Sequence, residues 1–115
     1  MARRWTAEEA AVIQMAALAD WNAGKVGKEF SEKQLGRNVF DIDIERTLRG
    51  QSTLICHYTD YGQPRYGFWH PQVRVFIAWQ SPEEGFRSQL KTCIRYEDGR
   101  GYMQRQDDFE PVRWK

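Results

Sequence analysis

The fold class is decided by the run Val73-Arg-Val-Phe-Ile-Ala-Trp-Gln80 and, after a turn, by the run Gln89-Leu-Lys-Thr-Cys-Ile-Arg-Tyr96. Both runs are rich in β-branched and aromatic residues, which is typical of strands. The turn between them contains Ser81-Pro-Glu-Glu-Gly85. Two strands joined by so short a loop must pair antiparallel, because parallel pairing needs a long crossover. The sequence therefore predicts an antiparallel hairpin.

Alternation within these two runs predicts which side chains share a face of the sheet. For the first run we expect Val75, Ile77 and Trp79 on one face, against Arg74, Phe76, Ala78 and Gln80. For the second run we expect Leu90, Thr92, Ile94 and Tyr96 on one face, against Lys91, Cys93 and Arg95. Neither run has a wholly polar side, so both faces should be partly covered. One face is expected to pack on helices, and the other to form a shallow, aromatic-rich concavity edged by Lys and Arg.

The two-residue period extends through the second half of the chain. Further strands are predicted at residues 52–58, 65–70 and 101–105, with a short last one at 112–114. Asp98-Gly99 is read as a tight hairpin turn before the strand at 101–105. Residues 51–115 are thus expected to form a meander of four to six antiparallel strands.

The first half of the chain predicts helices instead. Thr6 and Glu9 form a capping-box sequence, and apolar residues then recur at helical spacing as far as Trp21. A second helix is expected at 31–37. The segment 38–50 alternates partly like a strand, but its acidic start and terminal glycine favour a helix. The predicted architecture is α+β: residues 1–115 form a single domain, with helices in 1–50 and the sheet in 51–115.

Composition limits the function classes. The chain has 115 residues, with 17 basic and 16 acidic side chains, so its charge is too balanced to hold duplex DNA through bulk counterion release. The aromatic content of 14% suits either base stacking or protein interfaces. No signal peptide or apolar run of membrane-spanning length is evident, so we expect a cytoplasmic protein that does not contact membranes. Cys56 and Cys93 have no metal-ligand spacing; they are expected to be buried thiols, with a single disulfide as the alternative.

Polar side chains suited to phosphodiester chemistry are concentrated between residues 52 and 105. Metal-free RNA cleavage needs a base for the 2′-OH proton, an acid for the leaving oxygen and cations for the phosphate charge. Histidine serves both proton transfers near neutral pH, and His57 and His70 are the chain's only histidines. The expected catalytic residues are His57, His70, Arg65, Thr92 and Tyr102. The expected substrate-binding residues are Lys91, Arg95, Arg105 and Trp69, and no metal or cofactor is expected.

The stretch from Phe30 to Arg105 resembles the small RelE- and barnase-like endoribonuclease superfamily, which includes bacterial toxins. The resemblance lies in the helix Asp41-Ile-Asp-Ile-Glu-Arg-Thr-Leu48, in Arg65-Tyr-Gly-Phe-Trp69, in the apolar strand that follows, in Leu90-Lys-Thr-Cys-Ile94, and in an expected hairpin at Arg100-Gly-Tyr102. It implies a four-stranded sheet that acts on RNA as a hydrolase without a metal, with Arg65 and Thr92 in the site and His70 and Tyr102 as further candidates. Many such domains have a histidine in the helix before the sheet, whereas Phe30–Leu48 has none.

Three function classes therefore remain open. The first is a metal-independent, toxin-type ribonuclease. The second is a non-catalytic protein that binds a cognate inhibitor or target protein through an aromatic surface patch, as an inhibitor, immunity or phage-borne antagonist protein would. The third is a nucleic-acid-binding regulator without catalysis. Histidines clustered with Arg65 in one cleft would favour the enzyme, and an exposed apolar patch with separated histidines would favour the second class.

Overall fold

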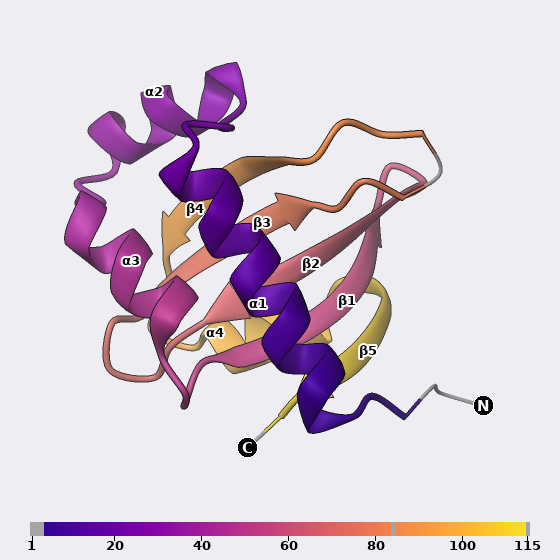
Figure 1. Ribbon diagram of the computed structural model, residues 1–115. Coiled ribbons are helices and arrows are strands. Elements are labelled where there is room, and N and C mark those ends of the chain that lie inside the picture. The colour runs from indigo at the N-terminus through magenta and orange to yellow at the C-terminus, as the bar shows by residue number, and fades with distance from the viewer. Residues whose placement is uncertain (1–3, 84, 115) are drawn as a thin grey trace.

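The computed structural model describes residues 4–83 and 85–114 and confirms the α+β class (Figure 1). Three helices precede the strands, and a fourth helix is inserted before the last strand. In chain order the elements are α1 (Ala7–Asn22), α2 (Lys28–Gly36), α3 (Asp41–Arg49), β1 (Leu54–Asp60), β2 (Gln63–Trp69), β3 (Val75–Gln80), β4 (Gln89–Arg95), α4 (Gly99–Gln104) and β5 (Asp107–Arg113).

The five strands form one antiparallel sheet in the order β4-β3-β2-β1-β5. Strands β1 to β4 are the predicted meander. The chain then crosses the sheet through α4, and β5 pairs with β1 at the opposite edge. The last strand therefore closes the side of the sheet far from β4, so the two edges are built from different sequences.

Both faces of the sheet are covered, as expected. On one face, α1 crosses the strands with α3 beside it (Figure 1), over a core that includes Phe30, Ile44, Phe68 and Ile77. On the other face, a smaller cluster around Phe76 includes Met103 of α4. The faces assigned to the first run are confirmed, since Val75, Ile77 and Trp79 belong to the helix-side core and Phe76 and Ala78 to the other cluster.

The predicted faces of the second run are confirmed for Thr92 with Ile94, against Cys93 with Arg95, but wrong for Leu90, because a bulge adds one residue to β4. Trp79 pairs with Leu90, but Ala78 pairs with Thr92, so Lys91 is the extra residue. Beyond the bulge the alternation is reversed. Cys93 consequently shares the helix-side core with Leu90, while Thr92 joins the opposite face.

The N-terminal helix begins as predicted: the Thr6 hydroxyl accepts the Glu9 N–H at 3.0 Å, and Glu9 accepts the Thr6 N–H at 3.0 Å. The second helix starts at Lys28 rather than Ser31, with Gly27 as its N-cap. Gly27 sits there because its N–H donates to the Leu90 carbonyl at 2.8 Å, which ties the start of α2 to the edge of β4.

The strand predicted at 101–105 and the hairpin predicted at Asp98-Gly99 are wrong, because these residues form α4. The Asp98 carboxylate accepts the Gly101 N–H at 2.9 Å and caps the helix. Gly99 lies against the Trp69 indole, where a side chain would collide with the ring. The last strand is correspondingly longer than the predicted 112–114, because β5 already begins at Asp107.

The two cysteines are buried and free, which confirms the expected thiols rather than a disulfide. Burial raises the pKa of Cys56 to about 12 and that of Cys93 to about 11, so both thiols stay protonated and unreactive at neutral pH. Within the described part of the chain, no helix has the length and apolar character needed to cross a membrane.

Candidate functional site

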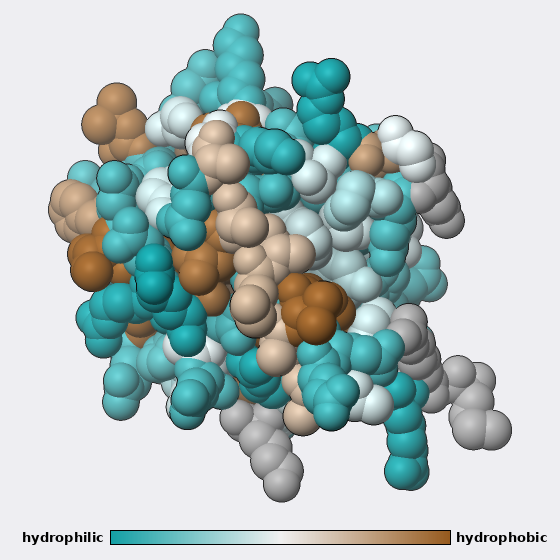
Figure 2. Space-filling view, viewed as in Figure 1, coloured by the Kyte–Doolittle hydropathy of each residue, from teal (hydrophilic) through white to brown (hydrophobic). Residues whose placement is uncertain are grey.

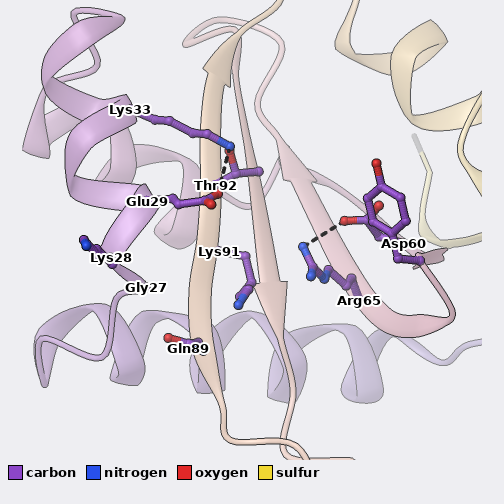
Figure 3. A pocket seen from close by; sticks show the side chains of 10 residues that line it. Gly27, Lys28, Glu29, Lys33, Asp60, Arg65, Gln89, Lys91 and Thr92 are labelled. Carbon is purple, nitrogen blue, oxygen red and sulfur yellow. Dashed lines mark ion pairs between the residues drawn. The ribbon is translucent and has the colours of Figure 1, made fainter.

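A polar groove of about 520 Å³ lies where the start of α2 approaches the sheet (Figure 3). Its walls come from α2, from β4 and from the turn between β1 and β2. The lining residues are Gly27, Lys28, Glu29, Lys33, Asp60, Tyr61, Arg65, Gln89, Lys91 and Thr92. Arg65 pairs with Tyr58 and Thr92 with Ala78, so both lie on the sheet face opposite α1.

The β1–β2 turn positions the groove's guanidinium. Tyr61 (φ 51°) and Gly62 (φ 78°) both occupy the left-handed region, as a two-residue type I′ hairpin requires. The turn places Asp60 close to Arg65, whose Nη1 lies 3.0 Å from the Asp60 carboxylate. It also leaves the Tyr61 side chain at the tip, 96% exposed.

The side chain of Arg65 is held in place by contacts within the protein, but these contacts do not use all of its N–H groups. Its side chain is only 13% exposed, and Nη2 donates to the Gln63 side chain at 3.3 Å. Its buried Nε has no hydrogen-bond partner among the described residues. The exposed part of this preoriented guanidinium suits an incoming anion, because a guanidinium matches phosphate with parallel hydrogen bonds.

Two lysines approach the groove from different elements. Lys91 is the bulged residue of β4, and it lines the groove together with Arg65 (Figure 3). Among residues 4–83 and 85–114, Lys91 has no ion-pair partner. Lys33 comes from α2, where its ammonium lies 3.5 Å from Glu29, next to Thr92 (Figure 3). The groove thus joins separate cations with a hydroxyl and a carboxylate.

Although the net charge is close to zero, basic and acidic side chains are concentrated at opposite edges of the sheet. Residues 25–37 and 87–95, at the β4 edge, hold seven basic and two acidic side chains, a difference of plus five. At the opposite edge, residues 7–10 of α1 and residues 107–113 of β5 hold one basic and five acidic side chains, a difference of minus four. The groove opens at the basic edge, where an anionic ligand is attracted.

Three of the expected site residues are brought together in this groove: Arg65, Lys91 and Thr92. The two histidines are not. His57 lies on the helix side of the sheet against Tyr66, at a ring distance of 4.8 Å, and 3.8 Å from the Glu110 carboxylate. His70 follows β2, four residues beyond Tyr66, which places the two histidines roughly 13 Å apart along the strand.

His70 has a local structural role. Its Nδ1 accepts the Gln72 N–H at 3.1 Å, which helps to form the turn into β3. Burial lowers the pKa of His70 below its usual value, and the nearby Arg46 lowers it further. The structure therefore holds this imidazole neutral, away from Arg65 and from the groove.

The remaining expected residues lie in packing or ion-pair contacts. Tyr102 is in α4 and stacks on Tyr96 at 4.2 Å; burial raises its pKa, with smaller effects from Tyr96 and Asp60. Trp69 is buried, and its indole N–H donates to the Tyr96 carbonyl at 2.9 Å, so it serves the core. Arg95 lies 2.8 Å from the Asp43 carboxylate. Arg105 is exposed at the end of α4.

Sequence reasoning missed Lys33, Glu29 and Tyr61. The first two lie in the helical half of the chain. Long-range contacts bring α2 beside β4, among them the Gly27–Leu90 hydrogen bond and the hydrogen bond from Arg37 to the Cys93 carbonyl at 2.7 Å. The exposure of Tyr61 could have been predicted, because Tyr-Gly between two strands suits a two-residue turn, and such a turn exposes its first side chain.

A second surface is apolar. Leu35, Phe40 and Ile42 are 85%, 62% and 58% exposed. They line a groove of about 640 Å³ between α2 and α3. This surface contains no tryptophan, but it is the kind of exposed apolar patch that protein-binding modules carry.

No protein-family model, curated protein or solved structure matches this chain. The function is therefore inferred from the chemistry of the groove.

Proposed function

We propose that this protein binds single-stranded RNA in the groove between α2 and the sheet. The observation that carries the proposal is the convergence of Arg65, Lys91 and Lys33 on one groove beside the fully exposed Tyr61. Each of these groups matches a part of a nucleotide. The cations suit phosphate oxygens, and an exposed aromatic ring suits stacking on a base.

A single strand fits these dimensions better than a duplex. A groove of about 520 Å³ accommodates one or two nucleotides, and three converging cations neutralise only a few phosphates. Hydrogen-bonding side chains, Thr92 and Gln89, line the same wall and could contact a ribose 2′-OH, the group that distinguishes RNA from DNA. The resemblance to small endoribonucleases points to the same ligand.

RNA cleavage is a second property that one groove residue favours. Glu29 lies next to Thr92 in the groove, and its carboxylate can take the 2′-OH proton as the 2′-oxygen attacks phosphorus and the bond from phosphorus to the 5′-oxygen breaks. The Lys91 ammonium can protonate the leaving 5′-oxygen, and Arg65 can stabilise the charge on phosphorus. Asp60 suits the role of base less well, because Arg65 holds it at 3.0 Å, closer than the 3.5 Å between Lys33 and Glu29. A base from α2 would take the place that the sequence assigned to a histidine.

The binding test is a titration of a fluorescently labelled single-stranded RNA, followed by anisotropy. Arg65→Ala and Lys91→Ala should each weaken binding about tenfold, as expected for one charge-assisted phosphate contact. Arg49→Ala is the matched control, since it removes an exposed cation on α3 and should leave the affinity unchanged. Equal affinities for all four proteins would contradict the proposal.

The cleavage test uses the same RNA with EDTA present. Cleavage should persist in His57→Ala and His70→Ala and be lost in Glu29→Gln and Arg65→Ala. Loss of cleavage in a histidine variant that binds RNA normally would contradict the role given to Glu29. Intact RNA in the presence of wild-type protein would exclude cleavage and leave the binding proposal standing.

The alternative of a protein-binding module rests on a different surface, formed by Leu35, Phe40 and Ile42. These side chains do not line the RNA groove. The double variant Leu35→Ser and Phe40→Ser should therefore bind RNA like the wild type. If RNA binding is absent throughout, the apolar surface becomes the better candidate for function.

A further inference from the structure

Helix α1 forms an outer layer of the molecule, and the side chains on its outward face are apolar. Residues 10–19 contain no charged side chain. Ala10, Gln14 and Ala17 are buried against the sheet, whereas Val12 is 65% and Met15 68% exposed. Figure 2 shows an apolar stripe down the middle of the face where Figure 1 places α1. A helix that is apolar all round is typical of one covered on both sides.

The exposed positions of α1 are symmetric about Met15. Ala11 and Ala19 are exposed and lie four residues before and after it. A second α1 helix running antiparallel would place Met15 opposite Met15 and Ala11 opposite the other copy's Ala19. The small alanines allow the two helix axes to approach to about 8 Å, the close end of the usual range.

The charges at the two ends of α1 are complementary to the same arrangement. Glu8 is exposed in the first turn and has no ion-pair partner among the described residues. Lys25, beyond the other end, is 58% exposed and only 4.0 Å from its nearest acid, Asp20. On a larger scale, α1 runs between the acidic β5 edge and the basic β4 edge (Figure 1). An antiparallel crossing therefore places basic groups of one copy over acidic groups of the other.

We infer that a second copy of this chain covers α1, so that two α1 helices cross antiparallel on a two-fold axis at Met15. The same surface supplies both sides of the contact, as a two-fold interface requires. The RNA groove belongs to the opposite sheet face and stays open in the dimer. The inference is thus independent of the proposed function. One helix pair is a small interface, so the dimer forms at micromolar or higher concentration.

The oligomeric state is measured by sedimentation velocity at about 100 µM, a concentration that populates small interfaces. The wild type should sediment as a dimer and Met15→Glu as a monomer. Leu35→Glu is the matched control, because it places the same charge at another exposed apolar position and should remain dimeric. Circular dichroism checks that each variant is folded. A monomeric wild type, or dissociation by both substitutions, would overturn the inference.

The geometry is tested by cysteine cross-linking, since Cys56 and Cys93 are buried. Under mild oxidation Met15→Cys should form a disulfide-linked dimer. Ala11→Cys should cross-link with Ala19→Cys in a mixture, and only weakly with itself. Glu8→Lys should weaken the dimer, and Glu8→Lys combined with Lys25→Glu should restore it. Failure of Met15→Cys to cross-link, or equal cross-linking by Leu35→Cys, would exclude this arrangement.

Discussion

The side chain of Arg65 is held in position by neighbouring residues and still lines a groove in which a ligand can bind. Asp60 and Gln63, on either side of the Tyr61-Gly62 turn, hold two nitrogens of its guanidinium. Because the turn fixes both partners, little side-chain entropy remains to be lost when an anion binds.

His70 predicts a pH dependence of stability. Its pKa in the folded protein is lowered by burial and by Arg46, whereas in the unfolded chain it titrates near about 6.5. Below that pH the unfolded state binds more protons, so the contribution of His70 to stability is complete above pH about 6.5. It is lost as the pH falls toward the folded pKa. Protonation of Nδ1 also removes the acceptor for the Gln72 N–H.

The measurement is urea unfolding of the wild type and His70→Gln between pH about 5 and 7.5, the range in which a histidine titrates. The unfolding free energy of the wild type should fall more steeply on acidification than that of His70→Gln. Identical pH dependence of the two proteins would show that the native state does not disfavour the imidazolium.

At the scale of elements, sequence periodicity predicted α1, α3 and the first four strands, because their signals are local. The Thr6–Glu9 capping box and the alternation in 73–80 needed no tertiary information. α4 could not be predicted in this way, because Asp-Gly is both a good hairpin turn and a good helix start. Residues 99–104 form a helix, and in this helix Gly99 lies against the indole of Trp69, a residue far away in the chain.

The residues of the candidate site likewise divide into those that local sequence signals predicted and those that only tertiary contacts place. Arg65, Lys91 and Thr92 were predicted from residue type and from their place in strands. The bulge that turns Lys91 toward the groove is a one-residue change of register, which the sequence pattern does not show. The contribution of α2 depends on long-range contacts with β4. The two histidines lie outside the groove, and residue type alone could not place them, because it does not say which face of a sheet a strand residue occupies.

Gly99→Ala tests the tertiary origin of α4. The added methyl would collide with the Trp69 indole, so we expect a destabilisation of about 1–3 kcal/mol, the usual cost of overpacking. Gly36→Ala is the matched control. It adds the same methyl to α2 where nothing lies within 4 Å, and it should be neutral or stabilising. Equal denaturation midpoints for the two variants would contradict the packing role of Gly99.

At the scale of the whole molecule, segregation of charge matters more than net charge. The basic β4 edge and the acidic side chains of β5 and of the first turn of α1 largely cancel in the total, yet each creates its own field. Under the proposed function, RNA approaching the groove meets the basic edge first, and the acidic side repels it. A chain that carries a net charge of only +1 can therefore bind a polyanion at one defined place.

Three of the cations that line the groove, Arg65, Lys33 and Lys91, are proposed to contact phosphates, and their number predicts the salt dependence of RNA binding. With about three phosphates neutralised, log K against log[salt] should have a slope of about −2 for a single strand. The slope comes from anisotropy titrations at several salt concentrations, and it should become shallower by about 0.7 in Lys91→Ala. A slope near zero would exclude phosphate contacts, and an unchanged slope in Lys91→Ala would exclude this lysine.

The central claim is that RNA occupies the groove between α2 and the sheet. It is tested most directly by following backbone amide resonances of isotopically labelled protein during titration with a short single-stranded RNA. The predicted result is that resonances of residues 27–33, 60–65 and 89–92 move, while those of α1 and β5 stay in place. Movements confined to α1, to β5 or to residues 35–42, or no movement at all, would contradict it.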